Sequence, residues 1–269
     1  MNRNVLLLAL LLFIFAFEAL AQSDANKFRY QPNKITIGTV YHYVKTNIDG
    51  TPPAENITIY VASKDRIEVF KSRTKGQRAG FVIADMDWTI FSAKHLESWQ
   101  AFPGGEKKLF ATLDYDAKEK VTNVSYGAAN QEVEKSAIKQ LPFHVYNFDF
   151  SSLNFAFRHL ISPKESFTIG IADPTFKETG PVFEYRGEAS VSYVGEETRD
   201  GVPCLKYKVD GAGLSNRGGF IWVDKKGEFF RDMEIQLPDN PEWQSFKFKL
   251  IKVEQMTRNQ WEAFMKEQL

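Results

Sequence analysis

Cysteine is nearly absent from this chain of 269 residues, in which Cys204 is the only one. A single cysteine excludes an internal disulfide framework and every zinc site built on paired cysteines. Histidine is also scarce, and the four present, at positions 42, 95, 144 and 159, form no His-x-x-x-His or His-Glu-x-x-His pair. We therefore predict no metal site and no cofactor, and we interpret Cys204 as a small buried apolar residue.

Net charge is absent too, because 34 basic residues are balanced by 34 acidic ones. A nucleic-acid-binding surface normally shows as an excess of basic residues, so we expect no nucleic-acid partner. The chain also has no acidic tail, no polybasic run and no internal repeat. Enzymes, small-molecule carriers and protein-interaction modules remain as the function classes to weigh.

The only long apolar run stands near the N-terminus, where Val5 to Phe17 follow a short polar start. Ala19 and Ala21 then supply the small residues that a signal peptidase reads, so we predict a signal peptide over residues 1–21, cleaved after Ala21. The run is too short for a stable transmembrane span, although an uncleaved anchor is the alternative. No cysteine directly follows it, which excludes acylation at a lipobox. We expect residues 22–269 to form one exported, periplasmic domain without a transmembrane segment.

Short runs of alternating apolar and polar residues recur through the chain, bounded by Gly, Pro, Asn and Asp. Leu205, Tyr207 and Val209, for example, alternate with lysines. This period of two is typical of antiparallel strands with one buried and one solvated face. The sequence therefore predicts a mainly β (β-rich α+β) fold, with a weak seam near residues 127–142 and a more recognisable half at 143–256.

Two segments have helical periodicity instead. One helix is predicted in the segment 149–163, with Ser151 or Ser152 as its N-cap and with Pro163 stopping it. The other is predicted at residues 257–269, which open with a Thr-x-x-Gln capping box. We expect the first helix to be central in the fold and the second to be C-terminal.

The glycine-rich stretch at residues 210–219, DGAGLSNRGG, raises the question of a phosphate-binding loop. A P-loop requires Lys and then Ser or Thr after Gly218, whereas Gly219 and Phe220 follow. It also requires a helix after the loop, whereas the next residues have a strand pattern. We therefore predict a plain loop between two strands, then a hairpin turn with Gly227 in the left-handed conformation.

The hairpin sequence WVDKKG, at residues 222–227, resembles the strand–turn–strand pattern of lipoprotein-carrier-like bacterial envelope proteins, with one residue fewer before the glycine. Residues 146–255 are also similar to an uncharacterised exported family, domain of unknown function 3108. The resemblance covers less than half of the chain, and its motifs are structural. It implies a long curved antiparallel sheet or half-barrel, with a helix against the concave face and a hydrophobic cavity, and it transfers no active-site residue.

Acidic and histidine side chains offer two candidate catalytic sites. Asp85 and Asp87 are alternate residues of an expected strand, so they project from one face, as the paired carboxylates of a glycosidase require. His144, Asp149 and His159 flank the central helix and form a second candidate, for acid–base chemistry or a metal. The alternative for this second group is that Asp149 caps the helix. No Gly-x-Ser-x-Gly elbow of a serine hydrolase is present.

These observations favour a non-enzymatic periplasmic protein that binds a lipid or an acyl chain between sheet and helix. The residues expected to line the site are Phe155, Phe157, Tyr207, Trp222, Phe246 and Phe248. The alternative for the same residues is a filled core. Two other functions stay open: an envelope structural or protein-interaction protein without a small ligand, and an envelope glycan hydrolase that uses Asp85 and Asp87.

Overall fold

The computed structural model of the protein describes residues 23–127, 133–177 and 179–269, so the predicted signal peptide and part of the predicted seam lie outside the described residues. The elements of the first half are η2 (Asp24–Lys27), η3 (Pro32–Lys34), β1 (Thr39–Thr46), β2 (Glu55–Val61), β3 (Arg66–Ser72), β4 (Ala79–Asp87), β5 (Ser92–Ala101), β6 (Lys107–Asp116), β7 (Val121–Tyr126) and β8 (Glu134–Ala137). Those of the second half are β9 (Phe143–Val145), α2 (Ser151–Phe157), β10 (Phe167–Pro174), β11 (Phe183–Arg199), β12 (Val202–Asp210), η4 (Ala212–Leu214), β13 (Gly219–Asp224), β14 (Phe230–Ile235), β15 (Phe246–Gln255) and α3 (Arg258–Gln268).

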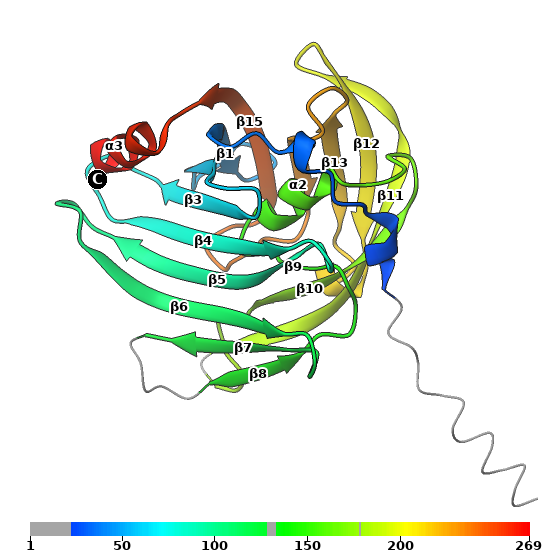
Figure 1. Ribbon diagram of the computed structural model, residues 1–269, viewed down its shortest axis with the longest axis horizontal. Helices are drawn as coiled ribbons and strands as arrows, with labels where there is room; N and C mark the ends of the chain where they lie inside the picture. The colour runs from blue at the N-terminus through cyan, green and yellow to red at the C-terminus, as the bar shows by residue number, and fades with distance from the viewer. Residues whose placement is uncertain (1–22, 128–132, 178) are drawn as a thin grey trace, which may run out of the picture.

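The named strands form one sheet in the order β8-β7-β6-β5-β4-β3-β2-β1-β15-β14-β13-β12-β11-β10-β9. Neighbouring strands are antiparallel, except that β9 and β10 run parallel. Figure 1 shows that the sheet curves around α2 and that its β8 end turns toward β10 and β11. The predicted mainly β fold, with one central and one C-terminal helix, is confirmed.

The concave face of the sheet and α2 enclose the larger hydrophobic core, which we call the inner core. The predicted alternation is confirmed in β12, where Tyr207 and Val209 are buried while Lys208 between them is exposed. It is confirmed again in β15, where Phe246 and Phe248 are buried. All seven residues of α2 are buried, since the helix lies inside the curve of the sheet.

The start and the end of α2 both differ from the prediction. Phe150, in the left-handed conformation, precedes the helix in place of a serine cap, and no side chain caps the first turn. The helix ends at Phe157, before Pro163. The next residues pair instead with the N-terminal segment, because the N–H of Arg29 donates to the carbonyl of His159 at 2.8 Å.

The C-terminal helix α3 packs on the opposite, convex face of the sheet, over β1 to β5, where it forms a second, smaller core. Its predicted capping box is present, formed by Thr257 and Gln260. Trp261 is fully buried against Tyr60, with the two rings stacked at 5.2 Å, and its indole N–H donates to Glu68 at 2.7 Å. Within the described part of the chain, no helix has the length and apolar character needed to cross a membrane.

The glycine-rich stretch forms a loop between β12 and β13, as predicted, and the following hairpin differs in one detail. The left-handed residue of that turn is Glu228, with φ of 55°, rather than Gly227. Asp224 orders the turn, because its carboxylate accepts hydrogen bonds from the N–H groups of Lys226 and Gly227. At position 227 a Cβ would lie 2.1 Å from the ring of Phe229, so a larger residue there would require that ring to move.

Asn154, from α2, fixes the helix to the sheet through a small buried network. Its side-chain oxygen accepts the N–H of Phe230 at 2.8 Å, and its amide donates to the Tyr43 hydroxyl at 2.9 Å. The Tyr43 hydroxyl in turn donates to the carbonyl of Phe230 at 2.8 Å. Because the network lies away from water, each of these polar groups depends on its partner in the protein.

Replacing Asn154 should therefore destabilise the fold measurably. We expect Asn154→Ala to lower the free energy of unfolding by about 1–3 kcal/mol, because the buried N–H of Phe230 loses its acceptor. Urea denaturation measures the change. The matched control is Asn33→Ala, at an exposed position, where we expect a change within about 0.5 kcal/mol. Equal losses in the two variants would show that the network does not hold α2 in place.

Candidate functional site

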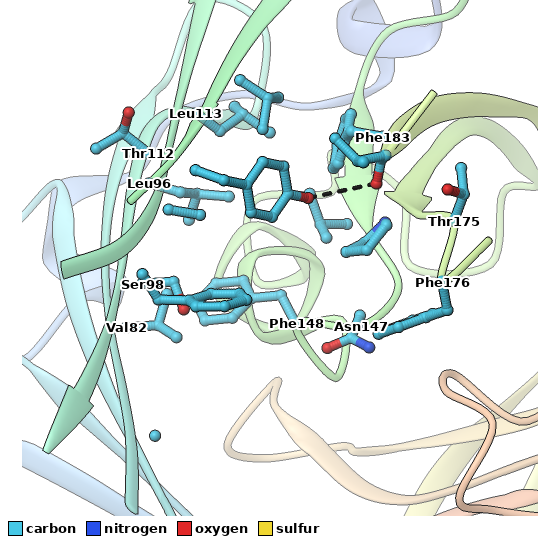
Figure 2. Close-up of a pocket in the computed structure, with 18 of the residues that line it drawn as sticks. Val82, Leu96, Ser98, Thr112, Leu113, Asn147, Phe148, Thr175, Phe176 and Phe183 are labelled. Carbon is cyan, nitrogen blue, oxygen red and sulfur yellow. Dashed lines mark hydrogen bonds between the residues drawn. The ribbon is translucent and has the colours of Figure 1, made fainter. Parts of the chain in front are cut away.

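An apolar cleft of about 360 Å³ lies on the concave side of the sheet, between the inner face of β4 to β7 and two segments that lie opposite this face. We call it the β4–β7 cleft. The facing segments are the link between β9 and α2 and the loop between β10 and β11 (Figure 2). The lining residues are Lys71, Gly80, Val82, Leu96, Ser98, Phe110, Ala111, Thr112, Leu113, Val124, Tyr126, Val145, Asn147, Phe148, Pro174, Thr175, Phe176, Lys177, Val182 and Phe183.

Large hydrophobic side chains gather around this cleft without being buried. Phe110, Phe176 and Val182 all line it, and they are 47%, 55% and 42% exposed. A single exposed apolar residue is ordinary, whereas several at one opening mark a surface that meets an apolar ligand or partner. The arrangement indicates a binding site.

Side-chain hydrogen bonds beside the cleft join β7 and β8, at one end of the sheet, to β11 and to the loop before it. The carboxylate of Glu134, in β8, accepts from the N–H groups of Val182 at 2.9 Å and Phe183 at 3.3 Å. Ser136 accepts from a further N–H of β11, and the Tyr126 hydroxyl donates to the carbonyl of Val182 at 3.3 Å (Figure 2). These bonds hold the β10–β11 loop over the strands, so they define one wall of the cleft.

A chain of buried charges lies at one end of the cleft. Lys71 lines the cleft, donates to the carbonyl of Asn147 at 2.9 Å and forms an ion pair with Asp149. Asp149 also pairs with Lys45 at 3.1 Å, and Lys45 pairs with Asp239. We call Lys71, Asp149, Lys45 and Asp239 the ion chain. It joins β1, β3, the start of α2 and the β14–β15 loop.

Burial and the neighbouring charges set the protonation of the ion chain. Burial disfavours the charged form of Asp149, but Lys45 and Lys71 outweigh it and hold its pKa below the usual value. Burial raises the pKa of Asp239 to about 6; Lys45 opposes this shift, and the charge of Asp149 adds to it. The carboxylate between the two lysines is therefore the more firmly ionised of the pair.

Asp173, in β10, is a further buried carboxyl, and it lies behind the segment between β9 and α2 that forms part of the cleft wall. It accepts the N–H of Asn147 at 2.7 Å and contacts Arg186 at 3.1 Å. Burial raises the pKa of Asp173 to about 8, since it outweighs the effects of the Asn147 N–H and of Arg186. Asn147 is thus held by Asp173 on one side and by Lys71 on the other, which fixes its position in the cleft wall.

The six residues expected to line a lipid site lie outside the β4–β7 cleft. Five of them are packed in the inner core, each at most 3% exposed: Phe155, Phe157, Tyr207, Phe246 and Phe248. Only a small cavity of about 40 Å³ adjoins Phe157 and Tyr207. Trp222 lies on the opposite face of the sheet, paired across the strands with Lys206, and its ring lies under the Arg199 guanidinium at 4.1 Å. Ligand binding at these six positions stays a prediction.

The two acidic candidates are engaged separately in local structure. Asp85 accepts two hydrogen bonds from the Arg66 guanidinium, at 2.6 and 2.7 Å, and this contact with Arg66 lowers its pKa. Asp87 instead accepts bonds from the N–H and hydroxyl of Thr89, which form a turn. A glycosidase needs one carboxyl whose pKa is raised and a second that stays ionised, so the lowered pKa of Asp85 fits only the second of these roles.

The histidine candidates and Asp149 also have structural roles. His144 is buried and contacts the Ser152 hydroxyl at 2.9 Å, while His159 packs edge-on to Trp88 at 4.7 Å. Burial lowers the pKa of both rings to about 3. Asp149 belongs to the ion chain and does not cap α2, which corrects the alternative that we weighed for it. Within residues 23–127, 133–177 and 179–269, no three His, Cys, Asp or Glu side chains converge as metal ligands.

Sequence reasoning missed the cleft, although one signal for its charged end is present. In β1 the inner-face positions are Tyr41, Tyr43 and then Lys45, and in β3 Lys71 follows Val69 on the same face. A lysine at the inward position of two strands is costly unless it is paired, so it indicates a buried carboxylate elsewhere. The local sequence around the two lysines cannot identify that carboxylate, because Asp149 is distant from both in the chain.

The raised pKa of Asp173 predicts a pH dependence of stability. The folded pKa lies above the unfolded value of about 3.9, so the stabilisation is complete below that value and is lost as the pH rises toward 8. We expect the free energy of unfolding to fall by about 1–2 kcal/mol from Asp173 between pH 6.5 and 8.

The measurement is urea denaturation at several pH values in that window, for the wild type and for Asp173→Asn. The variant should lose the part of the slope that comes from Asp173. Burial opposes the charged form of His95, but its bonds to Asp114 and Glu97 outweigh this and raise its pKa, so His95 acts in the same direction, as does Asp239, whose pKa burial raises to about 6. Below pH 6.5 the buried His144 and His159 act with the opposite sign, so that range is left out. An unchanged slope in Asp173→Asn would contradict the assignment.

Comparison with known proteins gives no family. No family model matches the chain, domain of unknown function 3108 included, and no curated protein matches it. Among solved structures, it is similar to a protein of the domain of unknown function 1329 family from Desulfovibrio piger, at 10% identity over 84% of this chain and 89% of that chain, with a TM-score of 0.27. It is also similar to a domain assigned to outer membrane lipoprotein sorting from Vibrio parahaemolyticus, at 9% identity over 85% of this chain and 91% of that chain, with a TM-score of 0.22. The structural neighbours thus include a domain described as a lipoprotein-sorting protein.

Proposed function

We propose that this protein is an exported, non-enzymatic binding protein that holds a lipid or other hydrophobic ligand in the β4–β7 cleft. The observation that carries the proposal is the cleft itself, with its volume of about 360 Å³ and its mainly apolar lining. Pockets for small ligands are typically about 300–1,000 Å³, lined by apolar side chains with a few polar groups. The export part of the proposal rests on the signal-peptide pattern of residues 1–21.

The composition of the cleft wall suits an apolar ligand. Lys71 and Lys177 are the two charged residues among the twenty that line it. Lys177 is paired with Glu184 at 3.4 Å, and Lys71 is part of the ion chain. Burying a methylene group contributes about 0.8 kcal/mol, so a chain of several methylenes offsets the ordering cost of binding.

The location of the site differs from the one expected between α2 and the C-terminal strands. That space is occupied by tightly packed aromatic rings, such as Tyr43 on Phe248 at 4.1 Å and Phe157 on Tyr207 at 4.9 Å. An acyl chain could enter there only by displacing the core, whereas the β4–β7 cleft is already open. The proposal therefore places the ligand against the N-terminal half of the sheet.

Filling the cleft tests the proposal. Ala111 is a small, half-buried residue of the cleft wall, on the same face of β6 as the buried Leu113. We expect Ala111→Trp to weaken the binding of a fluorescent fatty-acid probe at least tenfold, because the indole takes up the space of the chain. Titration of the probe, followed by fluorescence, gives the dissociation constants.

Ala117→Trp is the matched control, since Ala117 is exposed in the turn between β6 and β7. It should bind the probe like the wild type. Failure of the wild type to bind any acyl probe would overturn the carrier proposal and leave an interaction with a protein partner, for which the exposed Phe110 and Phe176 would be the first residues to test. Equal binding by both variants would place the ligand elsewhere.

A further inference from the structure

The polar end of the cleft holds one cation that is only partly neutralised. Lys71 lies on the inner face of β3, directly opposite Gly80 of β4, and its side chain is 14% exposed. Its ammonium group has three N–H donors. One bonds to the carbonyl of Asn147 at 2.9 Å, and a second faces Asp149. The third has no partner among the described residues.

The carboxylate that faces Lys71 is shared. Asp149 pairs with Lys45 at 3.1 Å as well as with Lys71, so its single negative charge serves two ammonium groups. Lys45 has a second carboxylate partner in Asp239, whereas Lys71 has no second carboxylate among its described ion pairs. Lys71, at the end of the ion chain, therefore shares a single carboxylate with Lys45, and part of its side chain is open to the cleft.

The other cation of the cleft is in a different situation. Lys177 is 54% exposed and faces Glu184, so its charge is solvated and already paired. An anionic group at Lys177 would gain little, because an exposed ion pair contributes little net stabilisation. Lys71 is thus the position at which an anion gains most from entering the cleft.

We infer that the ligand is a single-chain amphiphile with a carboxylate headgroup, bound with the carboxylate at Lys71 and with its chain along the apolar wall. This inference rests on the proposed function and specifies its ligand class. The wall beyond Lys71 is apolar, with Val82, Leu96, Leu113 and Phe183 around the space for the chain (Figure 2). The volume of about 360 Å³ is at the small end of the range for ligand pockets, which favours one chain over the two of a diacyl lipid.

Laurate and lauryl alcohol test the headgroup, because they share one chain and differ in charge. Each competes at pH 8 with a fluorescent fatty-acid probe on the full mature protein. We expect the dissociation constant of laurate to be at least about tenfold lower than that of lauryl alcohol. A hydrogen bond to a charged group contributes enough binding free energy to produce this difference. Lys71→Met should weaken laurate to the level of the alcohol and leave the alcohol unchanged, while Lys71→Arg should keep the preference.

The control is Lys177→Met, which should preserve the preference for laurate. Equal affinities of laurate and alcohol for the wild type would overturn the inference while the proposed function stands. Absence of binding by both would overturn the proposed function and the inference with it. A preference for laurate that survives in Lys71→Met or disappears in Lys177→Met would also overturn the assignment to Lys71. The wild-type comparison decides the headgroup even if Lys71→Met does not fold.

Discussion

The ion chain is the constraint on which the centre of this structure depends. Two lysines and two aspartates are brought together from four separate parts of the chain, and three of the four side chains are at most 1% exposed. Removing one member of a buried ion pair typically costs about 3–5 kcal/mol, because the remaining charge is left without compensation. The elements that carry these residues therefore have little freedom to move independently.

The strained start of α2 follows from this constraint. Asp149 and Phe150 are both in the left-handed conformation, with φ of 53° and 49°, which is unfavourable for side chains of this size. Asp149 gains its two ammonium partners in that conformation, and Phe150 is fully buried against the ring of Tyr146 at 4.9 Å. Packing and ion pairing thus outweigh the local preference for a serine cap.

The sequence was sufficient for the parts of the fold that depend on local patterns. Alternation identified the two faces of β12 and β15, and the Thr257–Gln260 capping box located the start of α3. The sequence was not sufficient where contacts between residues distant in the chain determine the structure. The end of α2 is set by pairing between residues near 29 and 159. The convex-face core joins Trp261 to Tyr60 and to other apolar residues of β1 to β5, and Glu68, far away in the chain, accepts the indole N–H.

The cleft could not be predicted for a related reason, which also explains why it lies where it does. Aromatic residues are dense in the second half of the chain, and their rings fill the space between α2 and β10 to β15. The inner faces of β4 to β6 include three small side chains that line the cleft, Gly80, Val82 and Ala111. The segment opposite them cannot collapse onto the sheet, since Asn147 is held by Asp173 and Lys71. Small residues on one wall and a fixed second wall therefore leave an open apolar space that Lys71 also lines.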